Sequence, residues 1–109
     1  MAWRLISAIT IVLAGTAGTV ADAPVGEPKT YTVTIADMRF QPESLTVAPG
    51  DLVIWINKDI VPHTATATGK FDSKTIDPTR SWSYRPRRKG DTAYVCALHP
   101  TMKGTLRVK

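Results

Sequence analysis

The segment Tyr94-Val95-Cys96-Ala97-Leu98-His99-Pro100-Thr101-Met102 carries the strongest structural and chemical signal in this chain. It holds the only cysteine and one of the two histidines, and a methionine follows in the spacing Cys-x-x-His-x-x-Met. Because side chains alternate along a strand, the thiol of Cys96 points inward if the ring of Tyr94 belongs to the core. A thiolate, an imidazole and a thioether in so short a segment favour a soft metal ion.

A known ligand set matches these side chains. Two imidazoles and a thiolate, with a distant thioether, hold the copper of blue-copper electron-transfer sites. The second imidazole has to come from His63, since the chain has no third histidine. We therefore predict a site for one copper ion made by His63, Cys96, His99 and Met102, the last two on one tight loop.

The start of the chain has the layout of a secretory signal peptide. Arg4 gives a positive start, residues 5–20 are apolar or small, and further small residues follow. An uncleaved membrane anchor is the alternative, but this run is diluted by glycines and threonines and is shorter than the ~20 apolar residues that span a bilayer. We expect residues 1–21 to be removed on export to the periplasm.

Two cleavage positions fit the rule for small residues before the cut, one after Ala21 and one after Ala23. Pro24 directly behind the second bond favours Ala21. Residues 22–30 contain two prolines and one glycine and are expected to be a flexible lead-in. Residues 31–109 then form one domain, in which metal ligation accounts for a lone cysteine that cannot make an internal disulfide.

Short alternating segments, punctuated by proline and glycine, predict an all-β domain. The segment 52–56 is apolar on both faces, so we expect a central strand covered on both sides. Residues 38–42 are expected to be an irregular crossing and residues 71–78 a loop or a frayed strand. The other expected strands lie at residues 31–35, 45–47, 64–68, 81–85, 92–96 and 105–109. Seven to eight short strands indicate a small antiparallel sandwich.

The combined motif resembles the cupredoxins. The ligand segment follows a Gly-Asp-x-x-Tyr-x-Cys strand over residues 90–96, Pro62-His63 lies upstream, and Gly-Thr-Leu-Arg-Val closes the chain at residues 104–108. The short ligand loop is most similar to that of the amicyanins. The resemblance covers residues 31–109 and implies a Greek-key β-sandwich with copper at one end and a weak axial bond from Met102.

Two residues depart from the pattern that the resemblance implies. Thr64 follows the first histidine, where blue-copper proteins commonly have asparagine, and Leu98 precedes the second, where amicyanins and plastocyanins have proline. Leucine keeps the N–H that proline lacks. We therefore hypothesise that the N–H groups of Thr64 and Leu98 both reach the Cys96 sulfur and raise the reduction potential, so that Leu98→Pro lowers it.

The resemblance implies a monomeric, periplasmic carrier of single electrons that is not an enzyme. His99 is expected to be the electron port, within an apolar collar of Pro62, Leu98 and Pro100 with Met38 or Phe40. A c-type cytochrome or a periplasmic dehydrogenase is the expected partner, with no nucleic acid and no stable membrane insertion after signal cleavage. Copper trafficking or storage remains the alternative function.

Other classes fit the residues less well. A Cys96–His99 nucleophilic dyad lacks an orienting group, methionine is a poor ligand for structural zinc, and intact ligands disfavour a metal-free adhesion sandwich. The formal net charge is +5, and the most concentrated charge lies at residues 85–89. This cluster could bind nucleic acid or acidic lipid. We expect instead a solvated turn between strands, at the opposite end of the sandwich and about 20 Å from the copper, since the strand to Cys96 rises ~3.3 Å per residue.

Overall fold

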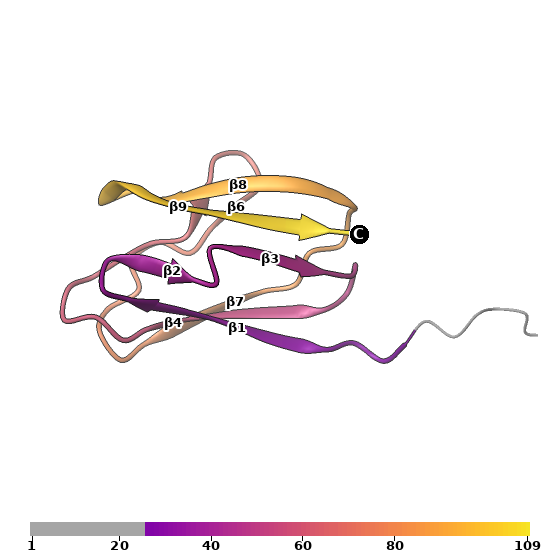
Figure 1. The fold of residues 1–109 in the computed structure, drawn as a ribbon, viewed down its shortest axis with the longest axis horizontal. Coiled ribbons are helices and arrows are strands. Elements are labelled where there is room, and N and C mark those ends of the chain that lie inside the picture. The colour runs from indigo at the N-terminus through magenta and orange to yellow at the C-terminus, as the bar shows by residue number, and fades with distance from the viewer. Residues whose placement is uncertain (1–25) are drawn as a thin grey trace, which may run out of the picture.

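Residues 26–109 are described in a computed structural model, in which two β-sheets pack face to face (Figure 1). The first sheet has the order β2 (Arg39–Gln41), β1 (Thr30–Ala36), β4 (Leu52–Asn57) and β7 (Ser81–Tyr84). The second has the order β3 (Ser44–Val47), β9 (His99–Val108), β8 (Gly90–Cys96), β5 (Thr66–Ala67) and β6 (Phe71–Asp72). The predicted all-β Greek-key sandwich is confirmed.

The predictions for the start of the chain fall mainly outside this range. The expected signal peptide at residues 1–21 lies wholly outside the described residues, and so do residues 22–25 of the expected lead-in at residues 22–30. Residues 26–29 precede β1 without regular structure. Within residues 26–109 no helix has the length and apolar character needed to cross a membrane.

Two of the strand pairs are parallel, so the expectation of a purely antiparallel sandwich is wrong. β1 pairs with β4 in parallel from Thr30↔Leu52 to Ile35↔Asn57, and β3 pairs with β9 in parallel. Between β2 and β4 the chain crosses to the second sheet, forms β3 and returns. This excursion turns β4 into the same direction as β1 (Figure 1).

The position of β4 is central, as predicted, but its two faces differ. Val53 and Trp55 are fully buried on the inner face, whereas the side chains of the outer face are half-buried. The prediction of cover on both sides is wrong, because only the flanking strands β1 and β7 shield the outer face. The aliphatic outer residues are Leu52, Ile54 and Ile56.

An aromatic cluster fills the space between the sheets. Trp55 lies 5.5 Å from Tyr94 and 5.7 Å from Phe71, measured between ring centroids. The Tyr94 ring lies over Gly104, its cross-strand neighbour, so closely that a Cβ on Gly104 would collide with it. Burial raises the pKa of Tyr94 to about 12. Because Tyr94 is a core residue, the alternation along β8 also turns Cys96 inward.

Some segments are more regular than their sequence predicts, and others are less regular. Residues 39–41 form β2 rather than an irregular crossing, and the segment 71–78 contributes β6. The segment 64–68 forms only the two-residue β5. The ligand segment is a hairpin in which a turn at Ala97 and Leu98 leads directly into β9, so His99 and Met102 lie on a strand and not on one tight loop.

Candidate metal centre

The β8–β9 hairpin positions three of the four predicted ligands. Cys96, the last residue of β8, is fully buried and pairs across the turn with His99, the first residue of β9. A register shift between Val95 and Cys96 marks a bulge at this point. Met102 is buried three residues along β9, in the inward-facing series that continues through Gly104 and Leu106. The sequence motif therefore becomes one compact end of the second sheet.

A loop after β4 delivers His63 from the first sheet. The side-chain amide of Asn57 donates to the carbonyls of Val61 and Ile76, both at 2.9 Å, and its oxygen accepts the N–H of Asp59 at 2.9 Å. His63 exchanges backbone hydrogen bonds with Ile76, with N···O distances of 3.2 and 2.7 Å. These bonds fix the backbone of a loop that carries a fully buried histidine.

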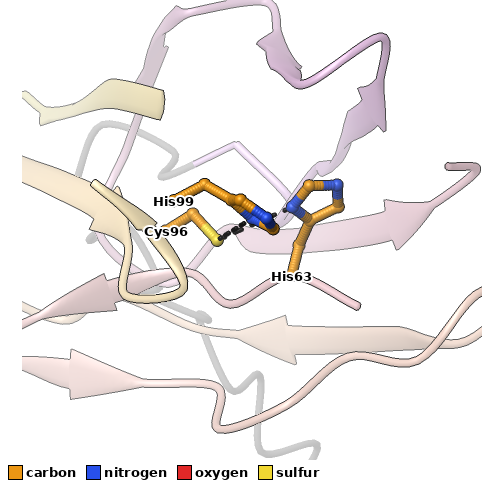
Figure 2. Close-up of side chains that lie close together, drawn as sticks. All are labelled: His63, Cys96 and His99. Atoms are coloured by element: carbon orange, nitrogen blue, oxygen red, sulfur yellow. Dashed lines mark hydrogen bonds between the residues drawn. The ribbon is translucent and has the colours of Figure 1, made fainter. Parts of the chain in front are cut away.

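The donor atoms of these side chains converge, although they come from segments more than thirty residues apart in sequence (Figure 2). The Nδ1 atoms of His63 and His99 each lie 3.6 Å from the Cys96 sulfur. All three donor atoms lie within 4.8 Å of one another. His63 is fully buried and His99 is half-buried, so the site has one closed side and one side toward the surface.

This spacing fits a single metal ion. Metal–sulfur and metal–nitrogen bonds of about 2.3 and 2.0 Å, at a trigonal angle, separate the sulfur from each nitrogen by about 3.7 Å. The observed separations of 3.6 Å agree with that value. The donor set of one thiolate and two imidazoles suits copper.

The backbone N–H of Thr64 donates to the Cys96 sulfur at 3.3 Å. A hydrogen bond of this kind draws negative charge from a thiolate and favours the reduced metal. The predicted approach of the Thr64 N–H to the Cys96 sulfur is therefore observed. Among the described residues no hydrogen bond joins the N–H of Leu98 to this sulfur, so the structure gives no support to the approach predicted for that N–H or to the effect expected of Leu98→Pro.

The hydroxyl of Thr64 ties the two ligand-bearing segments together. It accepts the N–H of Ala97 at 2.7 Å, next to Cys96, and lies 2.9 Å from the Thr66 hydroxyl. The Thr66 hydroxyl in turn donates to Asp72 at 3.2 Å on β6. Thr64, at the position where the resemblance leads one to expect asparagine, thus links the two ligand-bearing segments and, through Thr66, connects them to the edge strand β6.

Asp59 holds the other side of His63. Its Oδ2 lies 2.7 Å from the His63 Nε2 and accepts the N–H of Met38 at 3.0 Å, and its Oδ1 accepts the N–H of Asp37 at 2.8 Å. Asp37 and Met38 have φ of 52° and 58°, a left-handed conformation that non-glycine residues adopt rarely. One carboxylate therefore supports a strained turn between β1 and β2 and orients an imidazole so that its Nδ1 faces the sulfur.

Burial works against ionisation of Asp59, but its hydrogen bonds outweigh this effect. The N–H of Met38, the imidazole of His63 and the N–H of Asp37 together hold the pKa of Asp59 below its ordinary value. The carboxylate is thus ionised at neutral pH. A carboxylate that accepts the distal N–H of a metal-binding histidine increases the basicity of that ligand and fixes its tautomer.

Asp59 and Asn57 are the functional residues that the sequence interpretation missed. A carboxylate four residues before a predicted ligand was the available signal for Asp59. The apolar collar also needs correction, because Phe40 is buried against Tyr94 at a centroid distance of 4.7 Å. Met38 is exposed instead, and Ile60, which was not predicted to take part, is the most exposed large apolar residue.

Comparison with known proteins agrees with this geometry. The family model for copper binding proteins of the plastocyanin/azurin family matches residues 28–109. The chain belongs to this family. Copper is accordingly its cofactor, and the resemblance to cupredoxins seen in the sequence is confirmed.

Two of the proteins that this chain is similar to are amicyanins. Amicyanin-alpha of Methylorubrum extorquens is 29% identical over 109 residues, which covers 94% of this chain and 89% of the relative. Amicyanin of Paracoccus denitrificans is 31% identical over 83 residues, which covers 71% of this chain and 63% of the relative. A plastocyanin of Nostoc punctiforme is 31% identical over 67 residues, which covers 57% of this chain and 48% of the relative.

Solved structures of amicyanin variants share the fold. One structure in the Cu(I) state has a TM-score of 0.69 and 27% sequence identity, and the match covers 73% of this chain and 82% of the other. Another variant, in the oxidized state, also has a TM-score of 0.69, with 28% identity and the same coverage.

Proposed function

We propose that His63, Cys96, His99 and Met102 bind one copper ion in a type 1 (blue) site. The convergence of two Nδ1 atoms on the Cys96 sulfur, each at 3.6 Å, is the observation that carries this proposal. Met102 is assigned as the weak axial ligand because its thioether chemistry fits and because its side chain is buried at the same end of β9.

We further propose that the protein is a carrier of single electrons. Bound copper supplies a one-electron couple between Cu(I) and Cu(II). The protein contributes a site that is held rigidly in both states, because Cys96 and His63 are fully buried and bonded to the surrounding backbone.

Electrons are proposed to enter and leave through His99. It is the one half-buried member of the three converging ligands, and the others are fully buried. The residues around it form what we call the apolar collar: Met38, Ile60, Pro62, Leu98 and Pro100, all exposed. A small apolar surface suits short-lived redox complexes, which bury little area.

The proposed partners are a c-type cytochrome and a periplasmic dehydrogenase. Similarity to amicyanins supports this class of partner, and the apolar collar supports a transient contact. Periplasmic location is proposed from the signal-like residues 1–21. Copper trafficking is the weaker candidate, because a chaperone needs exchangeable ligands and two of the converging ligands here are fully buried.

The test begins with copper(II) titration of the purified protein. We expect one equivalent to produce an intense visible absorption from charge transfer between thiolate and copper, which reductant bleaches and oxidant restores. Stopped-flow mixing with a reduced c-type cytochrome should then show rapid bleaching. Leu98→Asp, which places a charge in the collar, should slow this step, whereas Thr68→Asp outside the collar should not. A weakly coloured site that quickly releases copper(I) to a chelator would contradict the proposal.

A further inference from the structure

The end of the sandwich opposite the metal centre contains a concave, strongly basic site. A pocket of about 590 Å³ opens between the β5–β6 turn and the segment that joins β7 to β8. Its cationic lining residues, here called the basic pocket, are Lys70, Arg85, Arg87, Arg88 and Lys89. No Asp or Glu is among the residues that line it. β8 spans seven residues between this end and Cys96, which is about 20 Å.

The charges of the basic pocket are free to bind an external anion. Within residues 26–109 the ion pairs are Asp59–His63 and Asp72–Lys74, and neither includes a residue of the pocket. The Arg85 guanidinium donates to the carbonyl of Gly50, which fixes its orientation at the rim. These five cations repel one another, and in the described part of the chain only Arg85 has an attractive carboxylate nearby, that of Asp51, so a bound anion lowers their electrostatic energy.

The walls of the pocket add an aromatic and apolar surface. Tyr84 and Phe71 both line it, with ring centroids 4.7 Å apart. Leu106 and Val108 of β9 complete the apolar side. Guanidinium groups bind phosphate oxygens in a bidentate manner, and amphipathic aromatic rings occupy the headgroup level of membranes. The combination suits a phosphodiester that is attached to an apolar body.

We propose that the basic pocket binds the headgroups of anionic phospholipids and docks this end of the protein on a membrane surface. This inference does not depend on the copper site. It describes peripheral contact and is compatible with the absence of stable insertion expected in the sequence analysis.

The start of the described chain enters the sandwich beside the basic segment. The N–H of Lys29 donates to Asp51 at 2.9 Å, and the N–H of Gly50 donates to the carbonyl of Pro86 at 2.8 Å. One turn, residues 48–51, therefore holds the start of the described chain beside the basic segment.

Docking in this orientation has a consequence for the metal centre. The turn between β8 and β9 and the C-terminal end of β9 lie at opposite ends of the second sheet (Figure 1), so a protein bound through the basic pocket presents the ligand hairpin away from the bilayer. Soluble redox partners then reach the site without competition from lipid.

The test uses the chain from Asp22 onward, which contains every described residue and the whole region matched by the family model. Its binding to phosphatidylcholine vesicles, with and without phosphatidylglycerol, is measured by co-sedimentation at low salt. We expect binding that requires phosphatidylglycerol and weakens with added salt. Replacing Arg87, Arg88 and Lys89 together by Gln should weaken it about 100-fold, because each cation near an anionic surface contributes about a factor of five.

A matched variant separates this pocket from diffuse charge. Arg39, Lys58 and Lys103 are exposed cations outside the pocket, and replacing all three by Gln changes the net charge by the same amount. This control should bind vesicles as the parent chain does. Equal weakening by both triple variants, or no dependence on phosphatidylglycerol, would overturn the proposal.

Binding measurements with soluble anions distinguish a lipid surface from other anionic ligands. Binding of sodium tripolyphosphate, or of an acidic protein, in the absence of any vesicle binding would also overturn the proposal. Circular dichroism and the copper-dependent absorption show whether each variant is folded. Because both are measured independently of lipid, a failure of membrane docking is distinguishable from a failure of the proposed copper function.

Discussion

The two ends of the sandwich differ in how firmly their polar and charged side chains are held. At the metal end, the side chains of Asp59, Thr64 and Asn57 hold separate loops together through hydrogen bonds to backbone groups and to His63. At the opposite end, cations surround an open pocket and only Arg85 among them has a backbone acceptor. A redox site needs fixed ligands, whereas a surface that meets anions needs accessible charge.

The largest effect is expected at the metal end, from Cys96→Ser. Copper bound at a thousand-fold excess over its dissociation constant stabilises the folded state by about 4 kcal/mol, and loss of the thiolate should remove most of this stabilisation together with the intense colour. Thermal unfolding with and without copper measures it. Arg88→Gln at the opposite end is the control and should keep both properties. An intense blue colour in Cys96→Ser would refute the ligand assignment.

A smaller effect is expected from Asp59→Asn. The amide is neutral, so the His63 imidazole becomes a weaker donor and the affinity for copper(II) should fall about 10-fold to 100-fold. The reduction potential should rise, because the oxidised metal loses more stabilisation than the reduced one. Copper competition with a chelator and voltammetry measure these changes. Asp77→Asn removes an exposed carboxylate outside the site and should change neither.

Next in size is Thr64→Ala, which removes the hydroxyl that accepts the N–H of Ala97. Loss of this hydrogen bond should lower the free energy of unfolding by about 1 kcal/mol. Thr64→Ser keeps the hydroxyl and should recover the stability, while Thr68→Ala at an exposed position serves as the control. Chemical denaturation of the copper-free proteins measures the difference. Equal stability of Thr64→Ala and the parent chain would show that the link between the loops is unimportant.

The smallest effect concerns Asp51, the one acidic anchor at the basic end. The N–H groups of Lys29 and Ala48 hold the pKa of Asp51 below its ordinary value of 3.8. The stability that the ionised carboxylate provides is therefore complete above 3.8 and is lost as the pH falls below that value and through the lower pKa of the folded state. Asp51→Asn should lower the melting temperature at pH 7, with a difference that shrinks as the solution is acidified.

Asp91→Asn is the control for that measurement, since Asp91 is an exposed carboxylate on β8, in the second sheet. It alters the net charge equally without touching the turn at residues 48–51. A difference between Asp51→Asn and the parent chain that stays constant down to acid pH would show that ionisation of Asp51 does not stabilise this end.

Local patterns in the sequence predicted the centre of the site because they encode it directly. Cys96, His99 and Met102 lie within one hairpin, so their spacing alone constrains where they meet. His63 was predictable for a different reason, since only one other histidine exists in the chain. The sandwich itself followed from alternation in short strands, which the burial of Tyr94 and Cys96 confirms.

The contacts that support the ligands depend on tertiary structure, so local sequence patterns do not predict them. Asp59 meets Asp37 and Met38 only because those two residues adopt positive φ in a turn from another part of the sheet. Phe40 was predicted to be near the surface, but β2 turns it toward Tyr94. The parallel pairs of β1 with β4 and β3 with β9 arise from chain crossings between sheets, which strand periodicity does not encode.

X-ray absorption spectroscopy of the copper-loaded protein tests the central claim most directly, because it counts the donor atoms around the metal. The account predicts one sulfur at about 2.3 Å and two imidazole nitrogens at about 2.0 Å, with any contribution from Met102 at a longer distance. In His63→Ala one nitrogen should be lost. A spectrum with no short sulfur bond, or one unchanged by His63→Ala, would contradict it.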